Sequence, residues 1–475
     1  MPLFAPHIVT PDSALGGKVI EKSLRFNGDN TYLNRTPTST SNRRTWTWSA
    51  WIKKTKNDAV QDLFSAYNGS SYNIIRIGSS NELYFQSNQA NIKKTNAKLR
   101  DTTSWYHIVV AIDTTSGTAA DRVIIYINGS RQSLAIDNSV SQNTDYAFNI
   151  TSQPHTIGVY ANGSSYNFDG YMAEINFVDG YQYDPSYFGY TESQTGMWRP
   201  KKYEGTHGTN GFRLDFHDSS SVAALGHDRS GNGNNYSSNN FSVTAGEDND
   251  SVEDTPSNNF CTLNPLNLGS GTLIEGGLET SPLNAGYAVR GTNFVSSGKW
   301  YFEFVVTAGT NMPTYALVGI QRDSGSLGSY SGTINIPDGY GLLLFGSTSY
   351  LYNGTTATAY NIGATSFNDV IGVAFDLDKG EIYFYRDGSL LGGGAPAYSN
   401  ITQGNYAPHV SNQTTSNNDM ECFVNFGQRP FAHTPPTGYR ALNSRNLATP
   451  SAAELIKPQR HFDTLIWDGN STQDR

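Results

Sequence analysis

The chain has 475 residues and a formal net charge of −9, so it is too long for one hydrophobic core and its charge disfavours nucleic acid as a partner. Aromatic residues make up 12% of it, which argues against disorder over most of its length. Only 15% of the residues are charged, whereas Gly reaches 47 and Tyr 29. This composition is typical of many short strands joined by Gly- and Asn-rich turns, and it predicts an all-β protein of several domains.

The first 17 residues form a separate segment punctuated by Pro and Gly. The segment 1–17 has no basic region followed by a continuous apolar stretch, so it does not have the pattern of a secretory signal. It is either an arm that anchors the chain on a partner or a frayed end. No apolar run in the chain is long enough to cross a bilayer, and we therefore expect no membrane insertion.

Strand patterns run from residue 18 to about residue 190. Residues 105–113 and 122–127 are two strands, and Asn128-Gly129 after them is a two-residue hairpin turn. The stretch WTWSAWIKK alternates, with one face holding Trp46, Trp48 and Ala50 and the other holding Thr47, Ser49 and Trp51. The closing strand, at 168–180, is expected to alternate in the same way, with Met172, Glu174 and Asn176 opposite to Ala173, Ile175 and Phe177.

Residues 191–255 are predicted to be a connector rich in Gly and Asn. One strand is expected in it, at 211–216, and its second half is expected to be looser than its first. The acidic cluster near its end has the oxygen ligands that calcium prefers but lacks the ligand spacing of a calcium loop. A solvated linker is the favoured interpretation of this cluster, which holds Glu247, Asp248, Asp250, Glu253 and Asp254.

The strongest fold signal lies at 369–392, in DVIGVAFDLDKGEIYFYRDGSLLG. An apolar strand at 370–376 is followed by a turn at Gly380, a second strand at 381–386 and the hairpin turn Asp387-Gly388. This is an antiparallel meander, and it repeats the plan of strand, loop, strand, hairpin turn and strand that is seen at 105–135. We therefore predict two β-sandwiches of one architecture.

The motifs in the two halves resemble two known families. LRFNGDNTYL, WSAWIK, WYHIVVAID, VIIYINGSRQ and FDGYMAEINFVDG occur in the order found in laminin-G-like, concanavalin A-type domains, over residues 18–190. GKWYFEFVV, ALVGIQR, DGYGLLLF, the meander and FVNFGQRPFAHTPPTGY resemble a SPRY domain, over residues 256–445. The resemblance implies an all-β fold of two concanavalin A-like antiparallel β-sandwiches (jelly rolls) joined by the connector.

The tail at 446–475 ends in a strand-like stretch at 462–467, which either adds to an earlier sheet, pairs with a neighbouring subunit or opens a further element. The two cysteines, Cys261 and Cys422, lie far apart in the sequence. They form either one disulfide or two buried thiols, and the second alternative is favoured.

Catalytic and metal-binding patterns are weak throughout. Glycosidases of this fold need two closely spaced carboxylates, and the nearest pair is Glu174 and Asp179, expected to be a solvent-facing residue and a turn former. His107 is expected in the core or an interface. Three histidines are evenly spaced in the connector, at His207, His217 and His227, but no Cys or carboxylate lies near them at the sequence spacing of metal ligands. We therefore expect no enzyme activity, no cofactor and no metal site.

Binding is better supported, because tyrosines among Asn, Ser and Gly suit the faces and hydroxyls of sugars. The candidate binding residues are Tyr160, Tyr166, Tyr181 and Tyr183 in the first domain and Tyr330, Tyr350 and Tyr352 in the second. The competing interpretation is that each of these tyrosines packs against a sheet or a neighbouring subunit.

The order of a laminin-G-like domain, the MWRPKKY connector and a SPRY-like domain resembles marine bacteriophage virion proteins. The resemblance implies a tail-fibre or other appendage component that is assembled in the host bacterial cytoplasm and located on the virion. It implies a homo-oligomer, with a trimer as one form, and contact with other virion proteins through the arm at 1–17. A host cell-surface glycan is the candidate ligand. The alternatives are a carbohydrate-binding receptor-recognition module and, less favoured, a capsule-degrading glycoside hydrolase.

Overall fold

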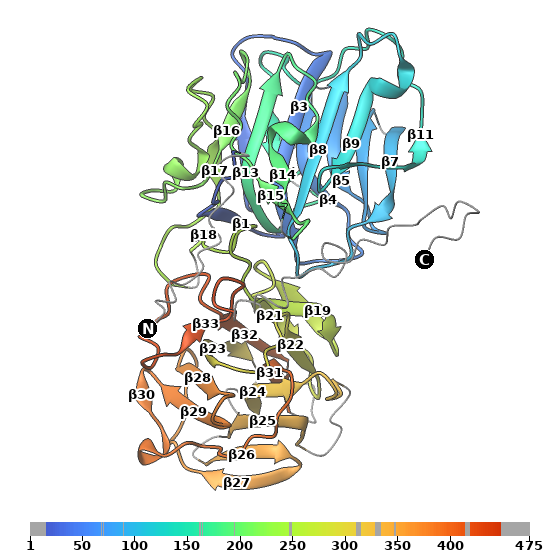
Figure 1. Cartoon of the computed structure of the whole chain (residues 1–475). Coiled ribbons are helices and arrows are strands. Elements are labelled where there is room, and N and C mark those ends of the chain that lie inside the picture. Colours follow the sequence, from blue (N-terminus) through green and yellow to red (C-terminus); the bar gives the residue numbers. More distant parts are fainter. Residues whose placement is uncertain are drawn as a thin grey trace, which may run out of the picture.

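The computed structural model describes residues 16–447 except 68, 70, 89, 161, 162, 164, 194, 247, 248, 310–314, 328–333, 346, 347 and 414–418. The anchoring predicted for 1–17 and the strand predicted in 446–475 therefore lie outside the described residues, apart from Gly16, Gly17 and the first two residues of the tail. The described residues form two antiparallel β-sandwiches, one above the other in Figure 1. This arrangement confirms the predicted all-β fold class.

The first sandwich has two eight-stranded sheets. One sheet has, in spatial order, β10 (Ser130–Arg131), β9 (Val123–Ile127), β8 (Tyr106–Asp113), β3 (Thr45–Lys54), β13 (Asp169–Asp179), β1 (Ser23–Asn27) and β18 (Ser251–Val252), and β16 (Phe212–Leu214) also pairs with β13. The other sheet has β11 (Leu134–Asp137), β7 (Ala90–Lys98), β6 (Glu82–Ser87), β5 (Tyr72–Ile77), β4 (Gln61–Tyr67), β12 (His155–Ile157), β2 (Tyr32–Arg35) and β17 (Ser237–Asn239). A separate two-stranded ribbon is formed by β14 (Gly189–Thr191) and β15 (Trp198–Pro200).

The second sandwich has a seven-stranded and an eight-stranded sheet. The first is β19 (Leu263–Leu268), β22 (Ala288–Gly291), β31 (Tyr406–Asn412), β24 (Ala316–Arg322), β25 (Ile336–Leu344), β26 (Ser349–Gly354) and β27 (Thr356–Tyr360). The second is β20 (Gly271–Ile274), β21 (Glu279–Leu283), β32 (Met420–Asn425), β23 (Lys299–Gly309), β28 (Val370–Asp376), β29 (Glu381–Arg386) and β30 (Ser389–Leu390), with β33 (Arg440–Ala441) parallel to β23.

Short 3₁₀ turns are η2 (Ala119–Asp121), η3 (Pro185–Tyr187), η4 (Ala223–Gly226) and η5 (Gly392–Gly394). Within the part of the chain described here, no helix has the length and apolarity needed to cross a membrane.

Each sandwich has a core of its own. In the first, Trp46, Trp48 and Ala50 of β3 join one buried cluster, while Trp51 belongs to a smaller cluster on the other side of the sheet. In the second, the buried cluster is formed by residues from 261 to 442. The alternation predicted for WTWSAWIKK is therefore confirmed, and the two cores do not merge.

The closing strand β13 does not alternate as the sequence predicts. Met172, Ile175 and Phe177 all enter the same core, although strict alternation would place Met172 on the opposite face from the other two. The register to β3 shifts between Ala173 and Asn176, and Glu174 has a φ of 47°. This is a β-bulge, in which an extra residue reverses the faces of the strand beyond it.

The segment predicted to be a connector contributes to the first sandwich for most of its length. β16, β17 and β18 extend the two sheets, and side chains such as Phe212, Leu225, Tyr236 and Phe241 lie in its core. Its buried aromatic side chains give this Asn- and Gly-rich segment the apolar surface with which it packs against the first sandwich.

Both predicted hairpin turns have the backbone that their sequences require. Asn128 and Gly129 have φ values of 48° and 80°, and Asp387 and Gly388 have 47° and 76°. Positive φ at both central residues is the mark of a type I′ turn, whose twist fits the flanking strands. The two cysteines are both free and buried, as favoured above.

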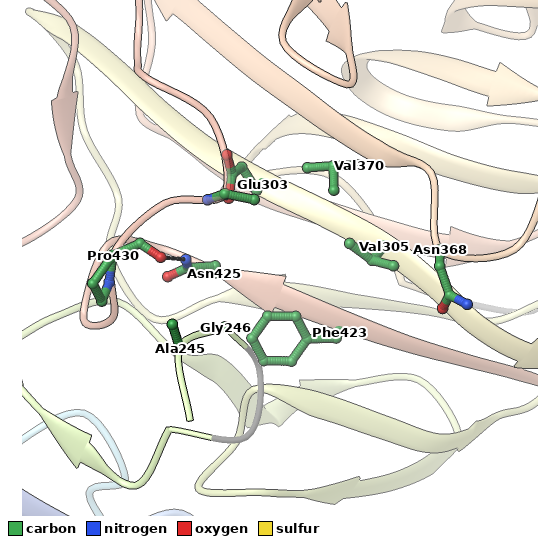
Figure 2. A pocket seen from close by; sticks show the side chains of 10 residues that line it. Ala245, Gly246, Glu303, Val305, Asn368, Val370, Phe423, Asn425 and Pro430 are labelled. Carbon is green, nitrogen blue, oxygen red and sulfur yellow. Dashed lines mark hydrogen bonds between the residues drawn. The ribbon is translucent and has the colours of Figure 1, made fainter. Parts of the chain in front are cut away.

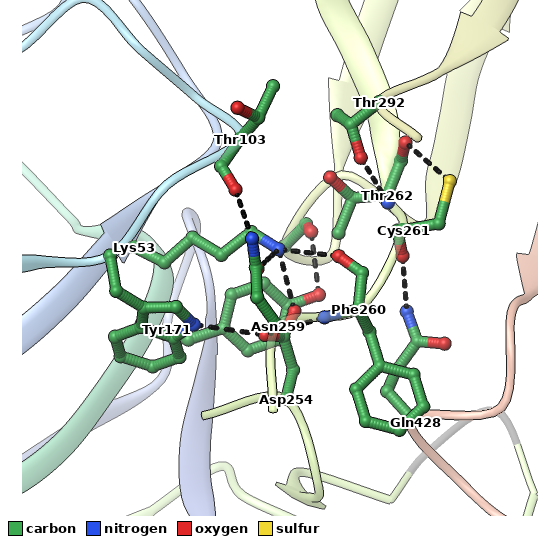
Figure 3. A network of polar contacts seen from close by, with 12 residues as sticks. Lys53, Thr103, Tyr171, Asp254, Asn259, Phe260, Cys261, Thr262, Thr292 and Gln428 are labelled. Atoms are coloured by element: carbon green, nitrogen blue, oxygen red, sulfur yellow. Dashed lines mark hydrogen bonds and ion pairs between the residues drawn. The ribbon is translucent and has the colours of Figure 1, made fainter. Parts of the chain in front are cut away.

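The two sandwiches meet through a buried polar network (Figure 3). Lys53, at the end of β3, donates to Asp254 Oδ2, Asn259 Oδ1 and the Phe260 carbonyl, each at 2.8 Å. Trp105 Nε1 donates to the other oxygen of Asp254 at 3.0 Å. Because Lys53 and Asp254 are both fully buried, each ion depends on the other for its stability.

A second set of contacts joins β1 and β13 to the turn after β20. Arg25 contacts Glu275 of this turn, and on its other side it pairs at 2.6 Å with Asp250, which directly precedes β18. The Tyr171 hydroxyl donates to the Gly276 carbonyl at 2.7 Å, and the Gly276 N–H donates to Asp169 Oδ1 at 3.0 Å. These bonds fix the second sandwich against the end of the first.

The favoured interpretation of the acidic cluster as a solvated linker is wrong for two of its residues. Asp250 and Asp254 are buried, and each pairs with a cation of the first sandwich. Burial raises the pKa of Asp254, although Lys53 opposes the shift. Glu247 and Asp248 lie outside the described residues.

Candidate functional site

A groove of about 500 Å³ lies on the first sandwich, outside the core. Its floor comes from β5 and β6, and its wall from the connection between β12 and β13. The residues that line it are Tyr72, Ile74, Arg76, Gln86, Tyr160, Ser165 and Tyr166. Tyr72, Ile74 and Arg76 alternate along β5, so their side chains share one face of the sheet.

Arg76 is held at the floor of the groove by Asp62 of the neighbouring strand β4. The Arg76 Nε and Nη2 groups donate to the two carboxylate oxygens of Asp62 at 2.7 and 2.9 Å. Burial raises the pKa of Asp62 to about 6, although the hydrogen bond and charge of Arg76 oppose the shift. The pair fixes the plane of the guanidinium and leaves Arg76 Nη1 without a hydrogen-bond partner among the described residues.

Three tyrosines surround this guanidinium. Its centre lies 4.7 Å from the ring of Tyr166, a cation–π geometry. The rings of Tyr160 and Tyr166 meet edge to face at 6.2 Å, and those of Tyr72 and Tyr160 at 5.7 Å. Tyr166 is 48% exposed, and its carbonyl accepts from the Asp62 N–H at 2.8 Å. The groove therefore combines exposed ring faces with a fixed charged donor.

The structure brings together only two of the candidate tyrosines in this groove, Tyr160 and Tyr166. Tyr72, Arg76 and Gln86 were missed. The alternation in YNIIRIG indicated that Tyr72 and Arg76 share a face, but only the packing of the sheets decides that this face is the outer one.

Tyr181 and Tyr183 lie in a separate stack at the end of β13. The rings of Tyr181 and Tyr183 are nearly parallel at 5.4 Å, and Tyr187 stacks on Tyr183 at 4.0 Å. Tyr181 is 46% exposed and Tyr187 43%. Tyr203, buried beneath the stack, has its pKa raised by burial and by the neighbouring tyrosines. The stack therefore presents aromatic rings to solvent at Tyr181 and Tyr187.

The candidate tyrosines of the second domain fit the packing interpretation. Tyr350 and Tyr352 are half-buried on β26 and pack against a small apolar cluster of Leu317, Ile336 and Leu343. Tyr330 lies outside the described residues.

A second hollow, of about 340 Å³, lies on the second sandwich beside Ala245 and Gly246 (Figure 2). Val305, Val370 and Phe423 give it an apolar lining, and Glu303 lies at one side. The carboxylate of Glu303 accepts from the N–H groups of Ala432 and His433 at 2.8 and 2.9 Å and from the Tyr301 hydroxyl at 3.2 Å. This carboxylate therefore already anchors Ala432 and His433, and the other polar side chains that line the hollow are the amides Asn368 and Asn425.

The nearest pair of carboxylates to a glycosidase pattern has structural contacts instead. The expectation that Glu174 is solvent-facing is wrong, because it is buried and pairs with Lys18 and Arg213. Burial alone would raise the pKa of Glu174, but these two cations outweigh it and hold the pKa below its usual value. Glu174 therefore stays ionised and is unsuited to act as a general acid.

Asp179, expected to be a turn former, is the last residue of β13, directly before the turn at Gly180, and it is buried too. Its carboxylate accepts from the N–H groups of Asn42 and Asn210 at 3.2 and 2.9 Å and from the Asn149 amide at 3.0 Å. The side chain holds three loops together at one end of the first sandwich.

The histidines have separate surroundings. His107 is buried between Trp51 and Trp198, as expected, and burial lowers its pKa to about 3. His207 contacts Asn176 at 3.1 Å, whereas His217 lies 3.1 Å from Glu21. Among the described residues, no group of three or more His, Cys, Asp or Glu side chains has the geometry of a metal site.

Two protein-family models match separate parts of the chain. Residues 27–181 match a laminin G-type model described as the concanavalin A-like lectin/glucanases superfamily. Residues 299–429 match the model of the SPRY domain. The two families and their order along the chain agree with the resemblances drawn from the motifs.

The curated protein E3 ubiquitin-protein ligase RKP of Arabidopsis thaliana is 31% identical over 116 residues, which are 23% of this chain and 9% of that protein. This chain thus spans less than a tenth of the length of that relative. The SPRY domain of human HERC1 aligns at 16% identity and a TM-score of 0.30, over 35% of this chain and 99% of that chain. Domains LG4-5 of the mouse laminin alpha1 chain align at 11% identity and a TM-score of 0.29, over 90% of this chain and 92% of that chain.

Proposed function

Because the chain carries a laminin G-like domain followed by a SPRY domain, we propose that it is a non-catalytic attachment protein of a bacteriophage virion. In this role it is a tail-fibre or other appendage component that displays its two sandwiches for assembly and for binding to the host surface. The ligand is a host cell-surface glycan, bound in the tyrosine groove of the first sandwich.

The observation that carries the glycan proposal is the chemistry of the groove. The exposed ring of Tyr166 and the half-buried ring of Tyr160 offer apolar faces to the C–H side of a sugar ring. Arg76, held in place by Asp62, offers a donor to hydroxyl oxygens without reorganising on binding. The volume of about 500 Å³ is in the range of small-ligand sites.

The buried network between the sandwiches suits a protein that bears force. Lys53 pairs with Asp254 on the chain that enters the second sandwich, and Arg25 contacts Glu275 of the second sandwich. A load on one sandwich is then passed to the other through ion pairs and hydrogen bonds shielded from water, which salt screens weakly.

Binding of the full chain to a glycan array of bacterial surface oligosaccharides tests the glycan proposal. Tyr166→Ala should raise the dissociation constant of retained glycans about fivefold, because an aromatic contact contributes about 1 kcal/mol. Tyr181→Ala is the matched control, since Tyr166 and Tyr181 are 48% and 46% exposed but only Tyr166 lines the groove. No retained glycan, or equal losses from the two variants, would contradict the proposal.

Immunogold labelling of purified virions with antibodies against this chain tests the location. Label on an appendage is expected, and particles that lack the label would rule out a virion role. The same antibodies, used after mild dissociation of the particles, should recover the chain as a homo-oligomer together with the virion proteins that its arm contacts.

The less favoured alternative is a capsule-degrading glycoside hydrolase. A reducing-end assay with host polysaccharide should show no turnover by the full chain. Turnover that is lost in Glu174→Gln, while the folded fraction stays unchanged, would overturn the non-catalytic assignment.

A further inference from the structure

The sheet of the second sandwich that begins with β19 ends in an unprotected strand, β27. Its five residues, Thr356–Tyr360, pair with β26 on one side, and the described residues provide no pairing on the other. Four of the five are exposed, and only Tyr360 packs against the core. The strand therefore presents a row of backbone N–H and C=O groups to solvent.

Every other described edge of the four large sheets has a feature that discourages pairing. β10, β18 and β30 have two residues each, and β17 has three. β19 contains Pro265, β11 contains Asp137, and both have a register shift, as has β20. Natural sheets block their edges with short strands, Pro, charges and bulges of this kind. β27 has none of them.

The charge distribution favours a second copy of this chain as the occupant of the edge. The sequence has no charged residue between Asp338 and Asp369, although the chain has a net charge of −9. Two copies with the same net charge repel each other, and a stretch of sequence without charged residues lets β27 approach a second copy at low electrostatic cost. β27 also lies at the end of the second sandwich remote from the first (Figure 1), so the first sandwiches of two paired copies stay apart.

We propose that β27 pairs in antiparallel fashion with β27 of a second copy across a two-fold axis. A register centred on Thr358 places the two Thr358 side chains opposite each other, a cross-strand pair that stabilises sheets. The two seven-stranded sheets then become one continuous sheet of fourteen strands. This contact is independent of the glycan groove, which lies on the other sandwich.

The contact between the two β27 strands is small, and we therefore expect a weak affinity. A five-residue strand spans only about 17 Å, and the pair buries less than the roughly 1,200 Å² of a standard interface. We expect a dimer with a micromolar dissociation constant, which gains strength where many copies are displayed together.

Sedimentation velocity of the full chain from 1 to about 100 µM should show a dimer that dissociates on dilution. Thr358→Lys sets two like charges across the axis and should raise the dissociation constant at least about tenfold. Ala364→Lys is the matched control, since it adds the same charge at an exposed residue outside the strand. A monomer at every concentration, or an oligomer that Thr358→Lys leaves unchanged, overturns the proposal.

Cysteine crosslinking tests the register without destabilising the strand. Under mild oxidation Thr358→Cys should form a disulfide-linked dimer, whereas Ala364→Cys should stay monomeric on a denaturing gel. The native Cys261 and Cys422 are both buried and do not interfere. Crosslinking of both variants to the same extent would show a non-specific encounter and overturn the two-fold pairing.

Discussion

The two sandwiches follow one strand plan but present different surfaces to solvent. The first has an outer face with a hollow lined by Tyr72, Arg76 and Tyr166. On the second sandwich, Tyr350 and Tyr352 of β26 cover an apolar cluster. The neighbouring strand β27 pairs with β26 on one side and leaves its other edge open among the described residues. The shared fold sets where the strands lie, whereas the side chains on the solvent faces decide whether a surface is hollowed or covered by apolar packing.

The largest expected change in stability comes from a substitution that breaks the polar network between the two sandwiches. Asp254→Ala leaves the Lys53 ammonium buried without its carboxylate, and should lower the free energy of unfolding by about 3–5 kcal/mol. Urea unfolding measures the loss, and limited proteolysis should detect faster cleavage near residue 254.

Glu204→Ala is the control for this prediction, because Glu204 forms an exposed pair with Lys202 and should change stability by less than about 1 kcal/mol. If Asp254→Ala proves no worse than this control, the network does not join the sandwiches in the way described.

The next effect depends on pH and concerns Asp169, which contacts both sandwiches. Burial raises the pKa of Asp169 to about 6, against the hydrogen bonds from Thr55 and Gly276. The folded protein therefore holds this proton more tightly than the unfolded chain, whose Asp pKa is about 3.9. The stabilisation is fully present below about pH 4 and is lost as pH rises through about 6, an effect of up to about 3 kcal/mol.

Urea unfolding at pH 7 and pH 5 measures this effect when the wild type is compared with Asp169→Asn. The amide oxygen of the substituted side chain can still accept from the Gly276 N–H, but the amide does not titrate. The variant should therefore lose the part of the pH dependence that Asp169 supplies. Identical pH dependence of the two proteins would show that Asp169 titrates normally.

The smallest expected change in stability concerns the hairpin turn that occurs in both sandwiches. Gly129 and Gly388 have φ values of 80° and 76°, so Ala at either position is strained by about 1 kcal/mol. A Cβ at Gly129 would lie 2.6 Å from the Trp198 indole, whereas at Gly388 it would lie 2.9 Å from the side chain of His433. Gly129→Ala should therefore destabilise more than Gly388→Ala.

Thermal unfolding of the two variants measures the difference. Trp198 is stacked on His107 and donates to it at 3.0 Å, so it has little freedom to move. Equal losses of thermal stability would mean that the Trp198 side chain moves away from the added methyl group as easily as the His433 side chain does.

Much of the fold could be predicted because its signals are local. Alternation in WTWSAWIKK assigns Trp46 and Trp48 to one face, and Asn128-Gly129 fixes a turn through two adjacent residues. The bulge at Glu174 could not be predicted, because nothing in AEINF marks it. It is defined by the pairing with β3, and the cations that Glu174 meets there, Lys18 and Arg213, are distant in the sequence.

The candidate site was predicted in part. Tyr160 and Tyr166 were identified by composition, but their partner Arg76 lies about ninety residues earlier in the chain, on β5. Asp250 and Asp254 were assigned to a solvated linker because acidic residues in a polar stretch are usually exposed. Their partners, Arg25 and Lys53, are more than two hundred residues away.

The strands, the hairpin turns and the presence of two domains could be predicted from the sequence, since each of these depends on neighbours a few residues apart. The packing of the sheets settled which tyrosines share a groove, which carboxylates are buried against cations and which strand is left at an edge. These features depend on side chains that are distant in the chain and become neighbours when the sheets pack, and their desolvation and pairing are settled at that step.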